Sequence, residues 1–156
     1  ANILFTLNRF VLVERHRNPI YESLVEKVER LLEMWREKTR DYGKVYAEGV
    51  KTVKEINSLL ARQRSLSFSD LEYSMLLELE KRLKGNDLVK VVKDLSERLK
   101  KHMFFGWSNQ ITAKKEVERE IRRFVRGMKG RYNLSLNEMN DLHGKIIENV
   151  KNYGNA

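Results

Sequence analysis

Residues 112–130 read TAKKEVEREIRRFVRGMKG, and this stretch indicates the fold of the whole chain. Apolar residues recur along it every three or four positions, the spacing that places side chains on one face of an α-helix. They are Val117, Ile121, Phe124, Val125 and Met128. We expect the helix to begin at Thr112 and to end near Lys129, closed by Gly130. The pattern therefore predicts a helix with one face turned toward a core.

The opposite side of this predicted helix is cationic. At 100° per residue, five basic side chains fall within an arc of roughly 80° and extend over about four turns, or roughly 20 Å. Glu116, Glu118 and Glu120 flank only the N-terminal half of this arc. We expect the arc to contact the phosphate backbone of a DNA duplex, or an acidic partner surface; the alternative is a solvated face. We call these five residues the cationic face: Lys115, Arg119, Arg122, Arg126 and Lys129.

Helical patterns also occupy the N-terminal half of the chain. Asn18 suits a helix cap and Pro19 its first turn. The apolar positions that follow are Ile20, Leu24, Val25, Val28, Leu31, Leu32 and Trp35. After Gly43 the apolar spacing resumes, either in a second helix or in one long helix that passes through the glycine. Its positions are Tyr46, Val50, Val53, Ile56 and Leu60.

The remaining helices are marked by their ends. Ser69 with Glu72, and Ser135 with Glu138, have the spacing of a capping box, in which each side chain bonds the other residue's backbone N–H. Between them, Gly85 is expected to stop one helix and Asp87 to cap the next. The cluster Phe104-Phe105-Gly106-Trp107 then breaks the pattern. We expect this aromatic cluster to be core between two helices, the alternative being a surface that stacks on nucleic-acid bases.

Composition supports an all-α fold. The 156 residues include one proline and eight glycines, with 41% hydrophobic and 34% charged residues. So few helix breakers predict an irregular helical bundle of five to seven helices, with long amphipathic helices. The chain starts with its most apolar segment. We expect residues 1–17 to be a severed N-terminal connector, the alternative being a terminus folded into its own core, and residues 18–156 to be a single helical assembly domain.

Charge and cysteine content narrow the setting. The net charge is +9, and residues 101–156 hold eleven basic against six acidic side chains. Such an excess favours a polyanionic partner or an acidic protein surface. The absence of cysteine is typical of a reducing compartment, so we expect a cytoplasmic protein. No apolar run approaches the roughly 20 residues of a membrane span, so no membrane partner is expected.

No catalytic signature occurs in the sequence. It contains no Gly-rich phosphate loop, no nucleophile elbow, and no Asp or Glu two residues before a lysine. His16, His102 and His143 lie far apart and form no ligand pair. We therefore expect no catalytic residue, no metal site and no cofactor in this chain. An enzyme with a site between bundle helices is a further possibility, but the sequence has no Glu-x-x-His motif to support it.

Three segments resemble a known family. Residues 18–32 (NPIYESLVEKVERLL), residues 66–73 (LSFSDLEY), and Trp107 followed by residues 120–126 (EIRRFVR) and Tyr132 carry the likeness. Together they resemble the C-terminal helical domain of the restriction (R, motor and endonuclease) subunit of type I restriction–modification enzymes. The match covers most of residues 18–132. Family members usually continue with a proline-containing segment after the final tyrosine, whereas this chain continues with Asn133-Leu134-Ser135.

The resemblance implies a non-catalytic assembly domain. It would dock the motor and nuclease subunit onto the methyltransferase core, near DNA, with the methyltransferase and specificity subunits as partners. The parent polypeptide would be an ATP-dependent type I site-specific deoxyribonuclease. The alternative is a stand-alone basic helical protein that binds nucleic acid, such as the small subunit of a defence ribonucleoprotein.

Overall fold

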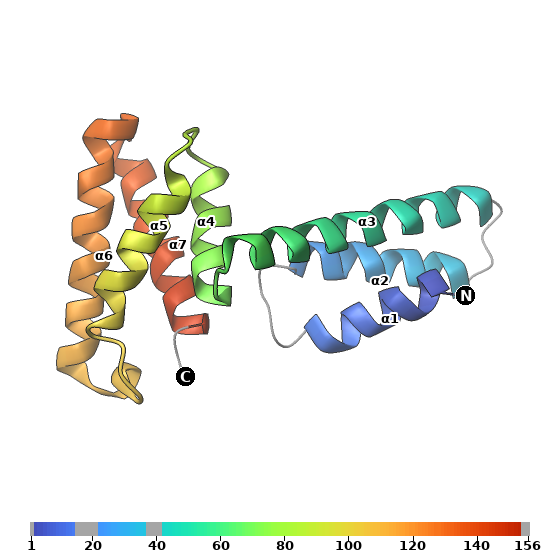
Figure 1. Cartoon of the computed structure of the whole chain (residues 1–156), viewed down its shortest axis with the longest axis horizontal. Coiled ribbons are helices and arrows are strands. Elements are labelled where there is room, and N and C mark those ends of the chain that lie inside the picture. Colours follow the sequence, from blue (N-terminus) through green and yellow to red (C-terminus); the bar gives the residue numbers. More distant parts are fainter. Residues whose placement is uncertain (1, 15–21, 37–41, 154–156) are drawn as a thin grey trace. The chain divides into compact units, whose positions relative to one another are not determined.

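The chain is helical throughout the part that the structure describes. A computed structural model describes residues 2–14, 22–36 and 42–153, which form seven α-helices and one 3-10 helix, without a strand (Figure 1). None of these helices is long and apolar enough to cross a membrane. The result confirms the all-α fold class. The elements are α1 (Asn2–Glu14), α2 (Glu22–Arg36), α3 (Tyr42–Leu66), α4 (Asp70–Glu80), α5 (Leu88–Lys100), η2 (Trp107–Asn109), α6 (Ile111–Tyr132) and α7 (Leu136–Tyr153).

The helices form two compact units, Ala1–Ser67 and Phe68–Ala156. This division differs from the boundaries expected from the sequence, which set residues 1–17 apart from one domain spanning 18–156. The difference arises because α1 contributes Leu7 and Phe10 to the same core as α2 and α3. The expected cap at Asn18 and first turn at Pro19 lie outside the described residues.

In the first unit, α1, α2 and α3 pack against one another (Figure 1). On α2 the predicted apolar positions from Leu24 to Leu32 are buried, with Val28 fully inaccessible to solvent, whereas Trp35 is half-buried. Ile20 lies outside the described residues. On α3 Ile56 is buried as predicted, but the start of the buried face differs from the prediction, because Val45 is buried whereas Tyr46 is 50% exposed. Buried Thr52 also belongs to this face. Its hydroxyl is satisfied by donating to the Glu48 carbonyl oxygen at 2.8 Å.

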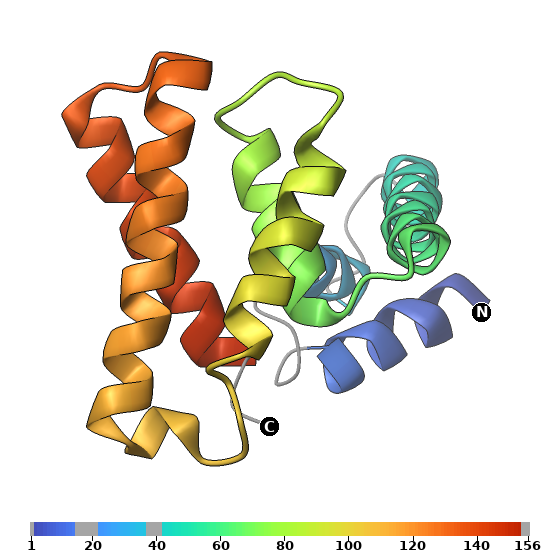
Figure 2. The ribbon, with the colours of Figure 1, turned by 60° about the vertical axis from the view of Figure 1, so that its left-hand side comes forward.

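The second unit is a four-helix bundle. Its helices alternate in direction, each packs against the next in sequence, and α7 closes the ring against α4 (Figure 2). The fully buried positions include Leu76 on α4, Leu95 on α5, Ile121 on α6 and Leu142 on α7. This up-and-down arrangement leaves one outward side on every helix.

The helix starts at Ser69 and Ser135 follow the sequence pattern, whereas the helix ends do not. Both bonds of the capping box at Ser69 are present, at 3.1 and 3.2 Å, and the Glu138 N–H donates to Ser135 Oγ at 3.2 Å. The glycines are not the stops that the sequence predicted. Helix α4 already ends at Glu80, well before Gly85.

Candidate functional site

Helix α6 is held in place by its apolar face. The buried side chains are the predicted ones with Ala113 added at the first turn: Ala113, Val117, Ile121, Phe124, Val125 and Met128. The helix continues through Gly130 to Tyr132, so the predicted end at Lys129 and Gly130 is wrong. Asn133 closes it instead, in the left-handed conformation (φ 53°) that asparagine tolerates better than most residues.

The cationic face is exposed along the whole of α6. All five of its residues, Lys115, Arg119, Arg122, Arg126 and Lys129, are exposed to solvent. Arg119 forms an ion pair with Glu116 at 3.0 Å, one turn before it. Among the described residues, the remaining four form no ion pair with a carboxylate. Glu116, Glu118 and Glu120 flank the N-terminal half of the face, and the Arg119–Glu116 ion pair lies there.

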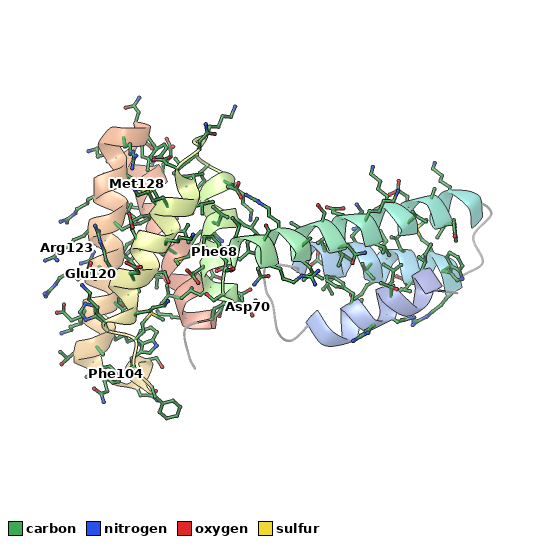
Figure 3. All side chains as sticks on the ribbon, in the orientation of Figure 1. Phe68, Asp70, Phe104, Glu120, Arg123 and Met128 are labelled. Carbon is green, nitrogen blue, oxygen red and sulfur yellow. The ribbon has the colours of Figure 1, made fainter. Side chains whose placement is uncertain are left out.

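A shallow groove between α5 and α6 adds a second basic surface. It has a volume of ≈ 170 Å³ and an apolar floor that includes Phe124 and Met128. Three arginines, Arg98 from α5 and Arg123 and Arg131 from α6, line it together with Asp94. Arg123 also pairs with Glu120 at 3.6 Å, and both lie on the outer part of α6 in Figure 3. Sequence reasoning missed this groove, because it requires knowing that α5 and α6 are neighbours.

One end of α6 is fixed by a polar contact with the start of α5. Tyr132 Oη donates to Asp87 Oδ1 at 2.7 Å, and Arg131 forms an ion pair with the other oxygen, Asp87 Oδ2. The Tyr132 hydrogen bond, with a smaller contribution from Arg131, holds the pKa of Asp87 below its ordinary value. Asp87 stands at the helix cap position, as predicted, but its side chain makes no capping bond. Instead it contacts Tyr132 and Arg131, which holds the C-terminal end of α6 against the N-terminal end of α5.

The aromatic cluster before α6 is divided between core and surface. Trp107 is buried, with 3% of its surface exposed. Phe104 and Phe105 are 48% and 90% exposed, so the prediction that the whole cluster is core is wrong for these two. Gly106 adopts the left-handed conformation (φ 79°) between them and Trp107. We call Phe104 and Phe105 the aromatic tip; Phe104 is labelled in Figure 3.

The described part of the chain presents no candidate metal centre. No group of three or more His, Asp or Glu residues in residues 2–14, 22–36 and 42–153 lies close enough to hold a metal ion. His102 lies 3.9 Å from Glu120, and His143 lies on α7. His16 lies outside the described residues. The candidate functional groups of this unit are therefore the basic side chains of α6 and the exposed aromatic tip that precedes α6.

Comparison with known proteins gives no match. No family model fits the chain, and neither a curated protein nor a solved structure is significantly similar to it.

His143 links α7 to the cationic face. Burial lowers the pKa of its imidazole below the ordinary value of 6.5, and the nearby positive charge of Arg122 lowers that pKa further. A hydrogen bond with the Glu118 backbone and the Glu118 charge act in the opposite direction but do not reverse the shift. Nε2 of the ring is buried and has no hydrogen-bond partner among the described residues. The imidazole is therefore held in its neutral form.

This shift predicts a pH dependence of stability. Because the folded chain binds the His143 proton more weakly than the unfolded chain, the contribution of His143 is fully present above pH 6.5 and is lost as the pH falls through the lowered pKa. We expect the free energy of unfolding to decrease over that interval, and His143→Gln to remove this part of the decrease. Urea titrations of both proteins at stepped pH, with NMR titration of the His143 ring, measure it. A ring that titrates at or above pH 6.5 would contradict the assignment.

Proposed function

We propose that this chain is a non-catalytic assembly module that binds a polyanion, the phosphate backbone of a DNA duplex, through the cationic face of α6. The observation that carries the proposal is the set of four exposed cations without an ion pair to the described residues, all on one side of a single helix. The set comprises Lys115, Arg122, Arg126 and Lys129. Together they span about 20 Å, a length along which roughly six base pairs present phosphates.

Electrostatics favours a ligand over a merely solvated face. Like charges three or four residues apart on a helix repel one another by a few tenths of a kcal/mol per pair. Arg122 and Arg126 have this spacing, and Lys129 follows three residues later. Folding gains nothing from this arrangement, since the opposite face of α6 supplies the packing. A bound phosphate backbone would neutralise these positive charges. The counterions released from the DNA would also favour binding.

The resemblance described above supplies a more specific form of the proposal. In that form, the chain is the C-terminal domain of a type I restriction enzyme R subunit. It acts in the cytoplasm, where it docks the motor and nuclease subunit onto the methyltransferase core beside DNA. The methyltransferase and specificity subunits are then its partners, and catalysis belongs to the parent polypeptide. Capture of a purified methyltransferase–specificity complex by the chain tests this form.

A second candidate is a stand-alone basic helical protein that binds nucleic acid, such as a small subunit of a defence ribonucleoprotein. Phe105 is 90% exposed, and this favours the second candidate, because aromatic side chains beside cations are typical of proteins that bind single-stranded nucleic acid. This candidate binds nucleic acid as the first does, but does not capture the methyltransferase–specificity complex.

Salt dependence tests the shared part of the proposal. With four phosphate contacts, the logarithm of the association constant for a duplex of about 20 base pairs should fall with log salt at a slope of about −4. Fluorescence anisotropy between about 50 and 200 mM salt measures this slope. A slope near zero, or no binding at the low-salt end, would exclude the cationic face as a DNA contact.

A further inference from the structure

The aromatic tip lies in the connection between α5 and α6. Phe105 leaves 90% of its surface exposed, although Trp107 two residues later is buried. The chain turns between them at Gly106, whose left-handed backbone (φ 79°) a residue with a side chain would adopt only with strain. Next, the Trp107 N–H donates to the Phe104 carbonyl oxygen at 3.0 Å, which closes the turn. A buried anchor and a closed turn therefore fix an exposed ring outside the core.

The surroundings of the tip are exclusively basic in sequence. Residues 98–115 contain no Asp or Glu. The stretch contains Arg98, Lys100, Lys101, Lys114 and Lys115, of which all but half-buried Lys114 are exposed. Apolar surface at this end of the bundle is extended by Ile111, which is 74% exposed. A partner that combines negative charge with a flat apolar group would fit this segment, beside which Glu120 lies 3.9 Å from His102.

The tip also precedes the cationic face closely in the sequence. Helix α6 begins at Ile111, six residues after Phe105, and the cationic face starts one turn later at Lys115. Ile111 is four residues before Lys115, so at 100° per residue its side chain falls within the same arc. Phe104 lies near the N-terminal end of α6 (Figure 3), so a strand that follows α6 toward this end would approach the tip.

We infer that Phe105 stacks on an unpaired base, so that the preferred ligand is DNA in which a duplex passes into a single strand. The inference rests on the proposed function and specifies the ligand of the same surface. Paired phosphates lie along α6, and the first unpaired base meets the exposed ring, which stacks on any base through its π face. A lipid surface fits less well, because membrane-binding helices expose an apolar face, whereas the apolar face of α6 is buried.

The test compares two DNA probes and two variants of the full chain. One probe is a blunt duplex of about 20 base pairs, and the other is the same duplex with a single-stranded overhang of about ten nucleotides. Wild type should bind the overhang probe about tenfold more tightly, the difference expected for one stacked base. Phe105→Ala should remove this preference and leave blunt-duplex affinity and its salt slope unchanged. A 2-aminopurine at the junction should lose fluorescence on binding wild type but not on binding Phe105→Ala.

Leu136→Ala is the matched control. Leu136 is 67% exposed in the first turn of α7, at the opposite end of the bundle, and its removal also deletes an exposed apolar side chain. It should keep the overhang preference. Urea titration of both variants checks that folding is intact.

The outcomes separate the inference from the function on which it rests. Binding of the blunt duplex without overhang preference, or an equal preference in Phe105→Ala, overturns base stacking alone. Loss of salt-dependent binding to both probes overturns the proposed function as well. Binding of vesicles rich in phosphatidylserine that disappears in Phe105→Ala, with no overhang preference, would assign the tip to a membrane surface and also overturn the inference.

Discussion

Reversing Arg122 and Arg126 to glutamate together is expected to weaken binding of a blunt DNA duplex at least about 100-fold. The physical reason is that each arginine loses a charge-assisted contact with phosphate. Hydrogen bonds to charged groups contribute about 1.5–3 kcal/mol each, and two of them amount to about 3 kcal/mol, or two orders of magnitude. The negative side chains then add repulsion. The salt slope should become shallower by about two, because two fewer counterions are released.

A matched charge reversal controls for the overall charge of the chain. Lys51 and Lys54 are exposed on α3, in the other compact unit, so Lys51→Glu with Lys54→Glu changes the net charge by the same amount. This control should keep most of the affinity and the slope of wild type. Circular dichroism should show the same helicity for all three proteins, since Arg122 and Arg126 are exposed and form no ion pair with the described residues.

One outcome of these two charge reversals would contradict the proposal. If the α3 reversal weakens binding as much as the α6 reversal, attraction depends on the total charge and not on the cationic face. The same two variants also test the more specific proposal. When the methyltransferase–specificity complex replaces DNA as the probe, loss of capture by the α6 variant alone would place that partner on α6.

The sequence could predict the two faces of α6, although not its C-terminal end, because the side-chain pattern along it is regular. Its apolar and cationic positions follow one helical period, so the buried side and the exposed side were both correct. Capping at Ser69 was equally predictable, because both bonds join residues three positions apart. Such features depend on neighbours in sequence, and they require no knowledge of which helices meet.

Other features depend on contacts that the sequence does not display. On α3 the buried face passes through Gly49 and Thr52, so its apolar period is hidden. Helix α1 comes close there, because a Cβ on Gly49 would lie 3.2 Å from Ile3 Cγ2. The arginine groove is similar, since Arg98 meets Arg123 only after α5 and α6 pack. Phe105 was expected in the core because aromatic residues are usually buried, and only the turn at Gly106 exposes it.

Truncating Ile121 to alanine is expected to destabilise the chain by about 2–5 kcal/mol, the usual cost of such a cavity in a core. Ile121 is fully buried, on a helix that packs against both α5 and α7. Close packing in protein cores leaves little room for neighbours to relax into the deleted volume. Ile121 lies on the side of α6 opposite the cationic face. The same substitution should therefore weaken the packing of α6 on the core and disturb the alignment of those cations.

Ile111→Ala makes the matched comparison on the same helix. It deletes the same atoms from a side chain that is 74% exposed, so its effect should stay within about 0.5 kcal/mol. Both variants are compared by urea titration, with Trp107 fluorescence as the reporter in a Trp35→Phe background. Equal midpoints for the two would mean that α6 is not anchored through Ile121. A much lower midpoint for Ile121→Ala than for Ile111→Ala would show that the core holds α6 in place through Ile121.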